Sequence, residues 1–236
     1  MFSVYVTGTD TGIGKTLASC ALLHAIRGHG LRVAGMKPVA SGCERIDGEW
    51  KNADALALQG AGEPGIAYAD INPFALEHPL APELAARDAG IEIDLPAILA
   101  AHARLAEQAD ALIIEGVGGW AAPLSGSLMQ ADLVRALRLP VLMVVGLRLG
   151  CLNHALLSAR AIAADGAHLT GWIASHVDPA MERVDDNLAM LRERLPAPCW
   201  GVLPHAEHPD PALLASRLRI PMPPKRMVPQ WRRVRR

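Results

Sequence analysis

A glycine-rich segment near the N-terminus ends in Gly14-Lys15-Thr16 and has residue types suited to phosphate binding. It follows the apolar run Val4–Thr7 and precedes the amphipathic pattern Lys15–Arg27, which is the context of a P-loop. Glycines let backbone N–H groups face phosphate oxygens, and the helix N-terminus adds a positive dipole. Lys15 would neutralise phosphate charge, and the Thr16 hydroxyl would ligate Mg²⁺. The glycine-to-glycine interval is one residue longer than usual, so a chance strand-to-helix turn is the alternative.

Two acids and a second lysine could reach the same phosphates. Glu115 ends the apolar run Ala111–Glu115 and suits a magnesium ligand, unless it only caps the next turn. Asp54 is a second candidate ligand, although by sequence alone it could cap the helix that follows. Lys37 ends another apolar run. It could stabilise charge on a transferred phosphoryl group or be a surface lysine before a turn.

A second strand–glycine–helix arrangement follows the apolar run Val141–Val145. The turn Gly150–Asn153 precedes a helix whose free N–H groups could receive a carboxylate. An ordinary Asn-capped helix is the alternative. We interpret Cys151 as a small packed residue rather than a nucleophile.

Short apolar runs alternate with helical patterns along the chain, which predicts an α/β fold. We expect a doubly wound, mostly parallel sheet flanked by helices, as in P-loop NTPases, with ligands at the carboxyl ends of its strands. The expected strands are Val4–Thr7, Arg32–Pro38, Ala111–Glu115, Val141–Val145, Gly171–Ser175 and Cys199–Leu203. The expected helices are Lys15–Arg27, Leu95–Gln108, Met129–Arg138, Asn153–Ala164 and Met181–Arg194. Gly42 to Pro96 is the least regular region, and we expect substrate-side loops there.

Composition fits one folded domain, residues 1–220, followed by a basic tail, residues 221–236. The net charge of −1 gives no global field for nucleic acid or a membrane. The tail has six Lys and Arg residues and no acid. We interpret it as a solvated extension, with an arm for nucleic acid or an anionic surface as the alternative. Neither a signal peptide nor a membrane-length apolar run is visible, and the four scattered cysteines form no CxxC pair, so we expect a cytoplasmic protein.

Several of these segments together resemble the dethiobiotin synthetase family, up to about residue 210 of the chain. The resemblance implies an ATP-dependent cyclo-ligase that carboxylates 7,8-diaminononanoate with CO₂ and closes the ring of dethiobiotin. It also implies ATP and Mg²⁺ as requirements, a homodimer, and no nucleic-acid or membrane partner. The segments that carry it are Val6–Thr11, Gly14–Thr16, Lys37–Gly42, Glu115–Trp120 with Pro123-Leu124, and Gly150–His154.

The resemblance further implies roles for individual residues. Around the metal it puts Thr16, Asp54 and Glu115. Around the carbamate and the γ-phosphate it puts Thr11, Lys15, Lys37 and Ser41. The neighbouring subunit would grip the substrate carboxylate with Gly150, Cys151, Leu152 and Asn153. ATP would contact Gly12, Ile13, Gly14, Lys15, Thr16, Leu17, Glu115, Gly116, Val117 and Gly118, with its adenine near Ser175, His176, Pro204, His205 and Ala206.

Some positions differ from the pattern of that family. Ser175 stands where an adenine-reading Asn often lies, and Asn187 stands where a Tyr can hold the substrate carboxylate. Gly12 replaces a Glu found in some members.

Two other functions remain as alternatives. A cobyrinate amidating enzyme would carry a glutaminase domain, for which this chain is too short. A partition- or septum-site ATPase would carry a second lysine early in the P-loop, where this chain has Thr9, Asp10 and Thr11.

Overall fold

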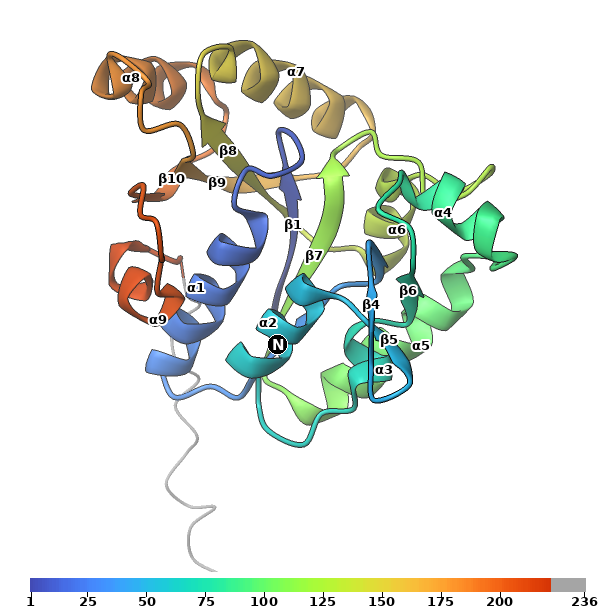
Figure 1. Cartoon of the computed structure of the whole chain (residues 1–236). Coiled ribbons are helices and arrows are strands. Elements are labelled where there is room, and N and C mark those ends of the chain that lie inside the picture. Colours follow the sequence, from blue (N-terminus) through green and yellow to red (C-terminus); the bar gives the residue numbers. More distant parts are fainter. Residues whose placement is uncertain (222–236) are drawn as a thin grey trace, which may run out of the picture.

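The computed structural model describes residues 1–221, and its centre is a six-stranded sheet (Figure 1). The strands are β1 (Phe2–Gly8), β2 (Val33–Met36), β7 (Ala111–Gly119), β8 (Val141–Leu147), β9 (Leu169–His176) and β10 (Cys199–Leu203). They lie in the order β10-β9-β8-β1-β7-β2, and all neighbours run parallel. The predicted α/β class and its six strands are confirmed.

Helices cover both faces of this sheet, which is why its strands are apolar throughout. The helices are α1 (Lys15–Gly28), α2 (Ala53–Ala61), α3 (Tyr68–Ile71), α4 (Pro82–Ala89), α5 (Leu95–Gln108), α6 (Gln130–Leu137), α7 (Cys151–Ala164), α8 (Val184–Arg194) and α9 (Pro211–Leu214), followed by the 3₁₀ turn η1 (Ala215–Arg217). Side chains of β1 alternate between the two layers. Val4 and Val6 belong to the core that α1 shares, whereas Tyr5 belongs to the core that α5 to α8 share.

The least regular region of the sequence is more structured than predicted. Besides loops, it holds the helices α2, α3 and α4 and three of the four strands of two small sheets. One sheet pairs β3 (Val39–Ser41), just before this region, with β6 (Phe74–Leu76), and the other pairs β4 (Glu44–Ile46) with β5 (Glu49–Lys51). Strands of three residues and a single helical turn are too short to show a hydrophobic period, so the sequence did not reveal these elements.

Two predicted helix starts also move. The helix expected from Asn153 begins at Cys151, because Gly150 adopts the left-handed conformation immediately before it. The helix expected from Met181 begins at Val184, after Arg183 in the same conformation.

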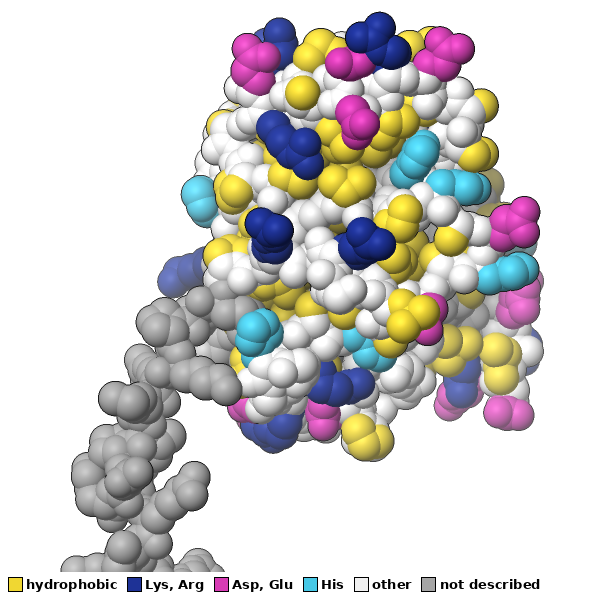
Figure 2. All heavy atoms as spheres, turned by 90° about the vertical axis from the view of Figure 1, so that its left-hand side faces the viewer, with side chains coloured by type: hydrophobic (Ala, Val, Ile, Leu, Met, Phe, Trp, Pro, Cys, Tyr) yellow, Lys and Arg dark blue, Asp and Glu magenta, His cyan; other side chains and the backbone are white. Residues whose placement is uncertain are grey.

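The surface features that bear on other partners are few. Within residues 1–221 no helix is long and apolar enough to cross a membrane. Figure 2 shows Lys and Arg side chains scattered over one face among acidic and apolar ones, rather than gathered in a continuous band. The predicted basic tail falls outside the described part of the chain, apart from its first residue.

A close approach between two strands gives a stability prediction. A Cβ on Gly171 of β9 would lie 2.1 Å from Nε1 of the buried Trp200. We expect Gly171→Ala to lower the free energy of unfolding by about 1–3 kcal/mol in urea titrations, because the indole must shift. Gly60→Ala, on α2 with no atom within 4 Å of the new methyl group, should raise it by about 0.5–1 kcal/mol. Equal stability of the two variants would contradict this packing.

Candidate active site

A cleft of about 910 Å³ opens at the carboxyl ends of β1, β2 and β7. This is the edge where ligands bind in open parallel sheets. Twelve of the predicted site residues line it: Thr11, Gly12, Ile13, Gly14, Lys15, Thr16, Lys37, Ser41, Asp54, Glu115, Val117 and Gly118. Segments far apart in the sequence therefore meet at one site, as predicted for the P-loop, the second lysine and the two acids.

The P-loop between β1 and α1 wraps around its own lysine. Gly12 and Gly14 adopt positive φ angles of 70° and 81°, and the Lys15 ammonium donates to the Asp10 carbonyl at 2.8 Å. Burial and, to a smaller extent, the nearby Lys37 together lower the pKa of Lys15 to about 8, against the opposite effect of the surrounding carboxylates. The loop thus presents a buried cation and the N-terminus of α1 to the cleft.

Lys37 and Glu115 form the most buried charged pair in this cleft. The Lys37 ammonium lies 2.6 Å from Oε1 of Glu115 and 3.0 Å from Oδ2 of Asp54. Burial alone would lower the pKa of Lys37, but the two carboxylates outweigh it and raise that pKa. The same ammonium lowers the pKa of Asp54 against the effect of burial. The shifts of both pKa values favour the charged forms of Lys37 and Asp54.

Glu115 connects this pair to the P-loop. Its Oε1 atom also accepts a hydrogen bond from the Thr16 hydroxyl at 2.9 Å. Its Oε2 atom is buried and has no hydrogen-bond partner among the described residues. A buried carboxylate oxygen without a donor fits a cation or a ligand that donates a hydrogen bond.

Asp54 does not cap its helix. The N-cap of α2 is Asn52, whose side-chain oxygen accepts from the N–H groups of Asp54 and Ala55 at 3.0 and 3.3 Å. The alternative prediction of a capping Asp54 is therefore wrong, and its carboxylate is available to the cleft. An Asn directly before the helical pattern was the signal that could have shown this.

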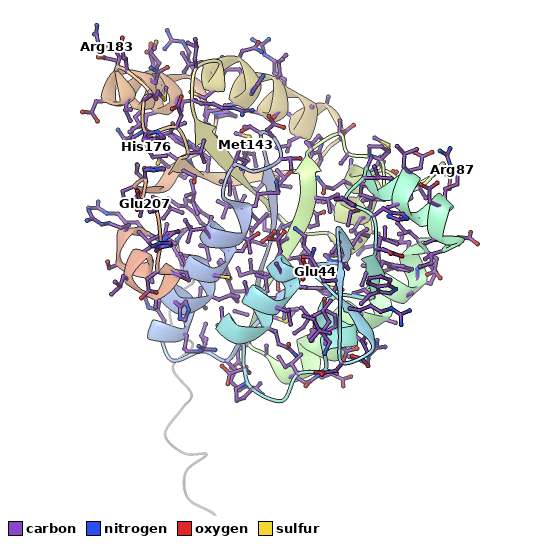
Figure 3. All side chains as sticks on the ribbon, viewed as in Figure 1. Glu44, Arg87, Met143, His176, Arg183 and Glu207 are labelled. Atoms are coloured by element: carbon purple, nitrogen blue, oxygen red, sulfur yellow. The ribbon has the colours of Figure 1, made fainter. Side chains whose placement is uncertain are left out.

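The residues expected at the adenine meet one another but do not line the cleft. Ser175, near the end of β9, lies beside the P-loop. A Cβ on Gly14 would lie 2.5 Å from the Oγ atom of Ser175. The rings of His176 and His205 stand edge to face, 6.2 Å apart, with Pro204 and Ala206 beside His205. Figure 3 shows His176 on the same side of the molecule as Glu207, and Arg87 of α4 on the opposite side.

The turn expected at the substrate carboxylate also lies outside the cleft lining. Gly150 and Asn153 are exposed, Leu152 is half-buried and Cys151 is buried, which fits a packed rather than a reactive thiol. Arg148 joins the turn to the P-loop through an ion pair with Asp10.

The side chain of Asn187, on α8, donates to the carbonyl of Arg183 one turn earlier. Leu17 and Gly116, expected at the phosphates, do not line the cleft either.

Eight lining residues were not among the predicted site residues. One group precedes and begins α4, another ends or follows β7, and one residue caps α2. Tertiary packing brings these segments to the strand ends. They are Pro79, Leu80, Ala81, Pro82, Gly119, Ala122 and Pro123, together with the capping Asn52.

Comparison with known proteins decides between the possible functions of such a cleft. Residues 3–212 match a family described as an AAA domain. An ATP-dependent dethiobiotin synthetase from Xanthomonas oryzae pv. oryzae is 61% identical over 217 residues, which cover 92% of this chain and 97% of the relative. The synthetase from Xylella fastidiosa is 59% identical, covering 91% and 95%.

This chain belongs to the dethiobiotin synthetase family. The family resemblance expected from the sequence is confirmed, and the alternatives of an amidating enzyme and of a septum-site ATPase fall away. One chain of a solved MinC:MinD cell division complex from Aquifex aeolicus is 13% identical, with a TM-score of 0.53, covering 88% of this chain and 83% of that one. At that identity the likeness shows a shared P-loop fold, while the synthetase relatives show the family.

The buried pair generates a prediction about stability. Lys37→Gln leaves the Glu115 carboxylate buried without its cation and should lower the free energy of unfolding by about 3 kcal/mol. The double variant Lys37→Gln/Glu115→Gln should recover most of this loss, because it removes both charges. Urea titrations measure both. Lys51→Gln, which breaks an ion pair with the exposed Glu49, is the matched control and should cost less than about 1 kcal/mol. Similar losses in the two single variants would contradict the assignment.

Proposed function

We propose that this cleft is where the enzyme, an ATP-dependent ligase of biotin synthesis, carries out its reaction. The reaction joins CO₂ to 7,8-diaminononanoate and closes the ring to give dethiobiotin, ADP and phosphate. The observation that carries the placement is the convergence of Lys15, Lys37 and Glu115, all buried, on one cleft. Because buried charges are costly without a partner, a site that gathers them is suited to a highly charged ligand.

ATP would lie with its phosphates in the P-loop. The positive φ angles of Gly12 and Gly14, the start of α1 and the Lys15 ammonium support this assignment. The adenine would lie toward Ser175, His176, Pro204, His205 and Ala206, because Ser175 adjoins Gly14. Ser175 offers a hydroxyl group rather than an amide, so we expect weak discrimination among bases.

We assign Thr16, Asp54 and Glu115 to Mg²⁺. The partnerless Oε2 of Glu115 fits a cation ligand. Residues 1–221 contain no cluster of three His, Cys, Asp or Glu side chains that could hold a metal. This suits Mg²⁺, which usually takes one or two carboxylates and completes its shell with water and phosphate oxygens. When bound, the ion would offset negative charge on the phosphate oxygens.

The reaction needs positioning and charge stabilisation rather than a protein nucleophile. One amine adds to CO₂ and loses a proton, giving a carbamate. A carbamate oxygen attacks the γ-phosphorus, ADP leaves, and a carbamic–phosphoric anhydride forms. The second amine then attacks the carbonyl carbon, and phosphate leaves as the ring closes. Lys15 and Lys37 would stabilise charge on the transferred phosphoryl group, and the Thr11 and Ser41 hydroxyls would hold the carbamate. The Ser41 Oγ is buried without a partner among the described residues, which supports a ligand there.

The substrate carboxylate would be held by a neighbouring copy of the chain. The turn Gly150–Asn153 begins α7, where the first N–H groups of a helix point outward, but it does not line the cleft of its own chain. Leu149, 95% exposed, and Leu157, 54% exposed, lie on the same turn and helix. Large apolar side chains beside such a turn support a contact between two copies. Residues 1–220 would form this synthetase domain, and its four free thiols suit a reducing cytoplasm.

The assignment of the lysines can be tested directly. We expect Lys15→Gln and Lys37→Gln each to lower turnover by at least about 100-fold, because each removes a cation from the transferred phosphoryl group. The assay combines diaminononanoate, bicarbonate, Mg²⁺ and ATP and detects dethiobiotin by mass, below the unfolding temperature of each variant. Lys51→Gln, outside the cleft, should retain turnover. Normal turnover in either cleft variant would refute the assignment.

The proposed dimer has its own test. Leu149→Asp should shift the protein toward monomer in sedimentation experiments and raise the KM for diaminononanoate more than that for ATP, since only the substrate carboxylate depends on the second copy. Leu213→Asp, 75% exposed on α9, is the matched control and should leave both unchanged. A monomeric wild-type protein with full activity would rule the dimer out.

A further inference from the structure

Strand β7 departs from the register of β1 where its residues enter the cleft. Val6 pairs with Glu115 and Gly8 pairs with Gly119, so Gly116, Val117 and Gly118 lie opposite the single residue Thr7. Such a bulge interrupts the ladder of backbone hydrogen bonds. Because this part of the sheet is largely buried, the freed N–H and C=O groups need other partners.

Gln130 supplies those partners from the first residue of α6. Its side chain is fully buried. Its Oε1 atom accepts from the Val117 N–H at 2.8 Å, and its Nε2 atom donates to the Gly119 carbonyl at 2.9 Å. Nε2 also lies 3.3 Å from the Thr7 hydroxyl, the acceptor in β1. One carboxamide thus connects β1 with the middle residue of the bulge and with the residue that follows the bulge.

The fit around this carboxamide is tight. A Cβ on Gly116 would lie 2.3 Å from Oε1 of Gln130 and 2.6 Å from the Tyr5 hydroxyl. Only glycine therefore lets the bulge approach α6 this closely. The position of Gln130 and the conformation of the bulge depend on each other.

The bulge forms the part of the cleft wall that adjoins the start of the P-loop. Val117, Gly118 and Gly119 all line the cleft, whereas Gln130 does not. Gly118 has a positive φ of 51°, and a Cβ there would lie 3.5 Å from the Thr11 hydroxyl. The wall that Gln130 holds therefore faces the part of the P-loop proposed to hold the carbamate.

We propose that Gln130 is a positioning residue for the ring-forming reaction. Its carboxamide replaces the missing strand ladder, fixes the bulge against β1 and so sets the distance between the Val117–Gly119 wall and Thr11. It acts through the backbone of the bulge and does not touch the substrate. This role rests on the proposed function of the cleft.

The test compares three variants. Gln130→Met keeps the volume of the side chain but removes all its hydrogen bonds, and Thr7→Val removes only the acceptor in β1. Gln59→Met is the matched control, because the Gln59 amide donates to the Ile66 carbonyl at 3.1 Å and lies outside the cleft. Amide hydrogen exchange of Val117–Gly119, in the protein without substrates, reports on the bulge independently of activity. Steady-state kinetics then give kcat and the KM values for diaminononanoate and ATP.

We expect exchange at the bulge to accelerate at least about fivefold in Gln130→Met, because a buried hydrogen bond is lost. We expect kcat to fall about 10- to 100-fold while the KM for ATP changes less than about threefold. A small displacement of the wall would misplace the carbamate that accepts the phosphoryl group but would leave the nucleotide in place. Thr7→Val should show the same pattern with a smaller effect, and Gln59→Met should show neither change.

Two results would overturn the positioning role. In the first, Gln130→Met folds but its amide exchange at the bulge or its kcat is unchanged, and Thr7→Val also matches the wild-type protein. The other is a loss in Gln130→Met that Gln59→Met matches, because a general loss of stability would then explain both. Failure of the wild-type protein to form dethiobiotin would instead overturn the proposed function, and the exchange measurement would still show whether Gln130 holds the bulge.

Discussion

The proposed active site depends on one ion pair, between Lys37 and the fully buried Glu115, at 2.6 Å. Neither charge could remain buried without the other, since an unpaired ion inside a protein costs several kcal/mol. Strand register brings the two together. Met36 of β2 pairs with Ile114 of β7, so the next residue of each strand is the charged one. Lys37 and Glu115 thus lie at the same edge of the sheet, because they follow paired residues of two adjacent strands.

The position of β7 between β1 and β2 extends this pair into a site. On its other side, β7 places Glu115 opposite Val6 of β1, just before the P-loop begins. The start of α1 then brings the Thr16 hydroxyl within 2.9 Å of the same carboxylate. In the sheet β7 lies between β1 and β2, although it follows both of them along the chain, so the crossovers of the doubly wound topology are what assemble the site.

The sequence was informative where a local pattern also determined the structure. Strands buried on both faces appear as apolar runs, and charged residues at their ends, such as Lys37 and Glu115, must meet at one edge. The sequence was uninformative where pairing between distant segments decided the outcome. The three-residue strands β3 to β6 have no period of their own. Asp54 is available to pair with Lys37 because Asn52, not Asp54, caps helix α2. The hydrogen bonds of Gln130 depend on a bulge in β7, which is a different element.

A shared fold does not by itself separate a ligase from a nucleotide switch, since the MinC:MinD complex contains a chain of similar fold. A P-loop supplies a place for phosphates in either kind of protein. A ligase must also hold an acceptor in line with the phosphoryl group, and this demands a second, rigid wall. In the proposed site, that wall would consist of Lys37, the Ser41 hydroxyl, which has no hydrogen-bond partner within residues 1–221, and the glycine bulge after Glu115. Glycine suits such a wall because its backbone can approach a ligand closely, but glycine is also flexible. A bulge built from it needs support from another element, and the fully buried carboxamide of Gln130 gives that support through hydrogen bonds to the middle residue of the bulge and to the residue that follows it.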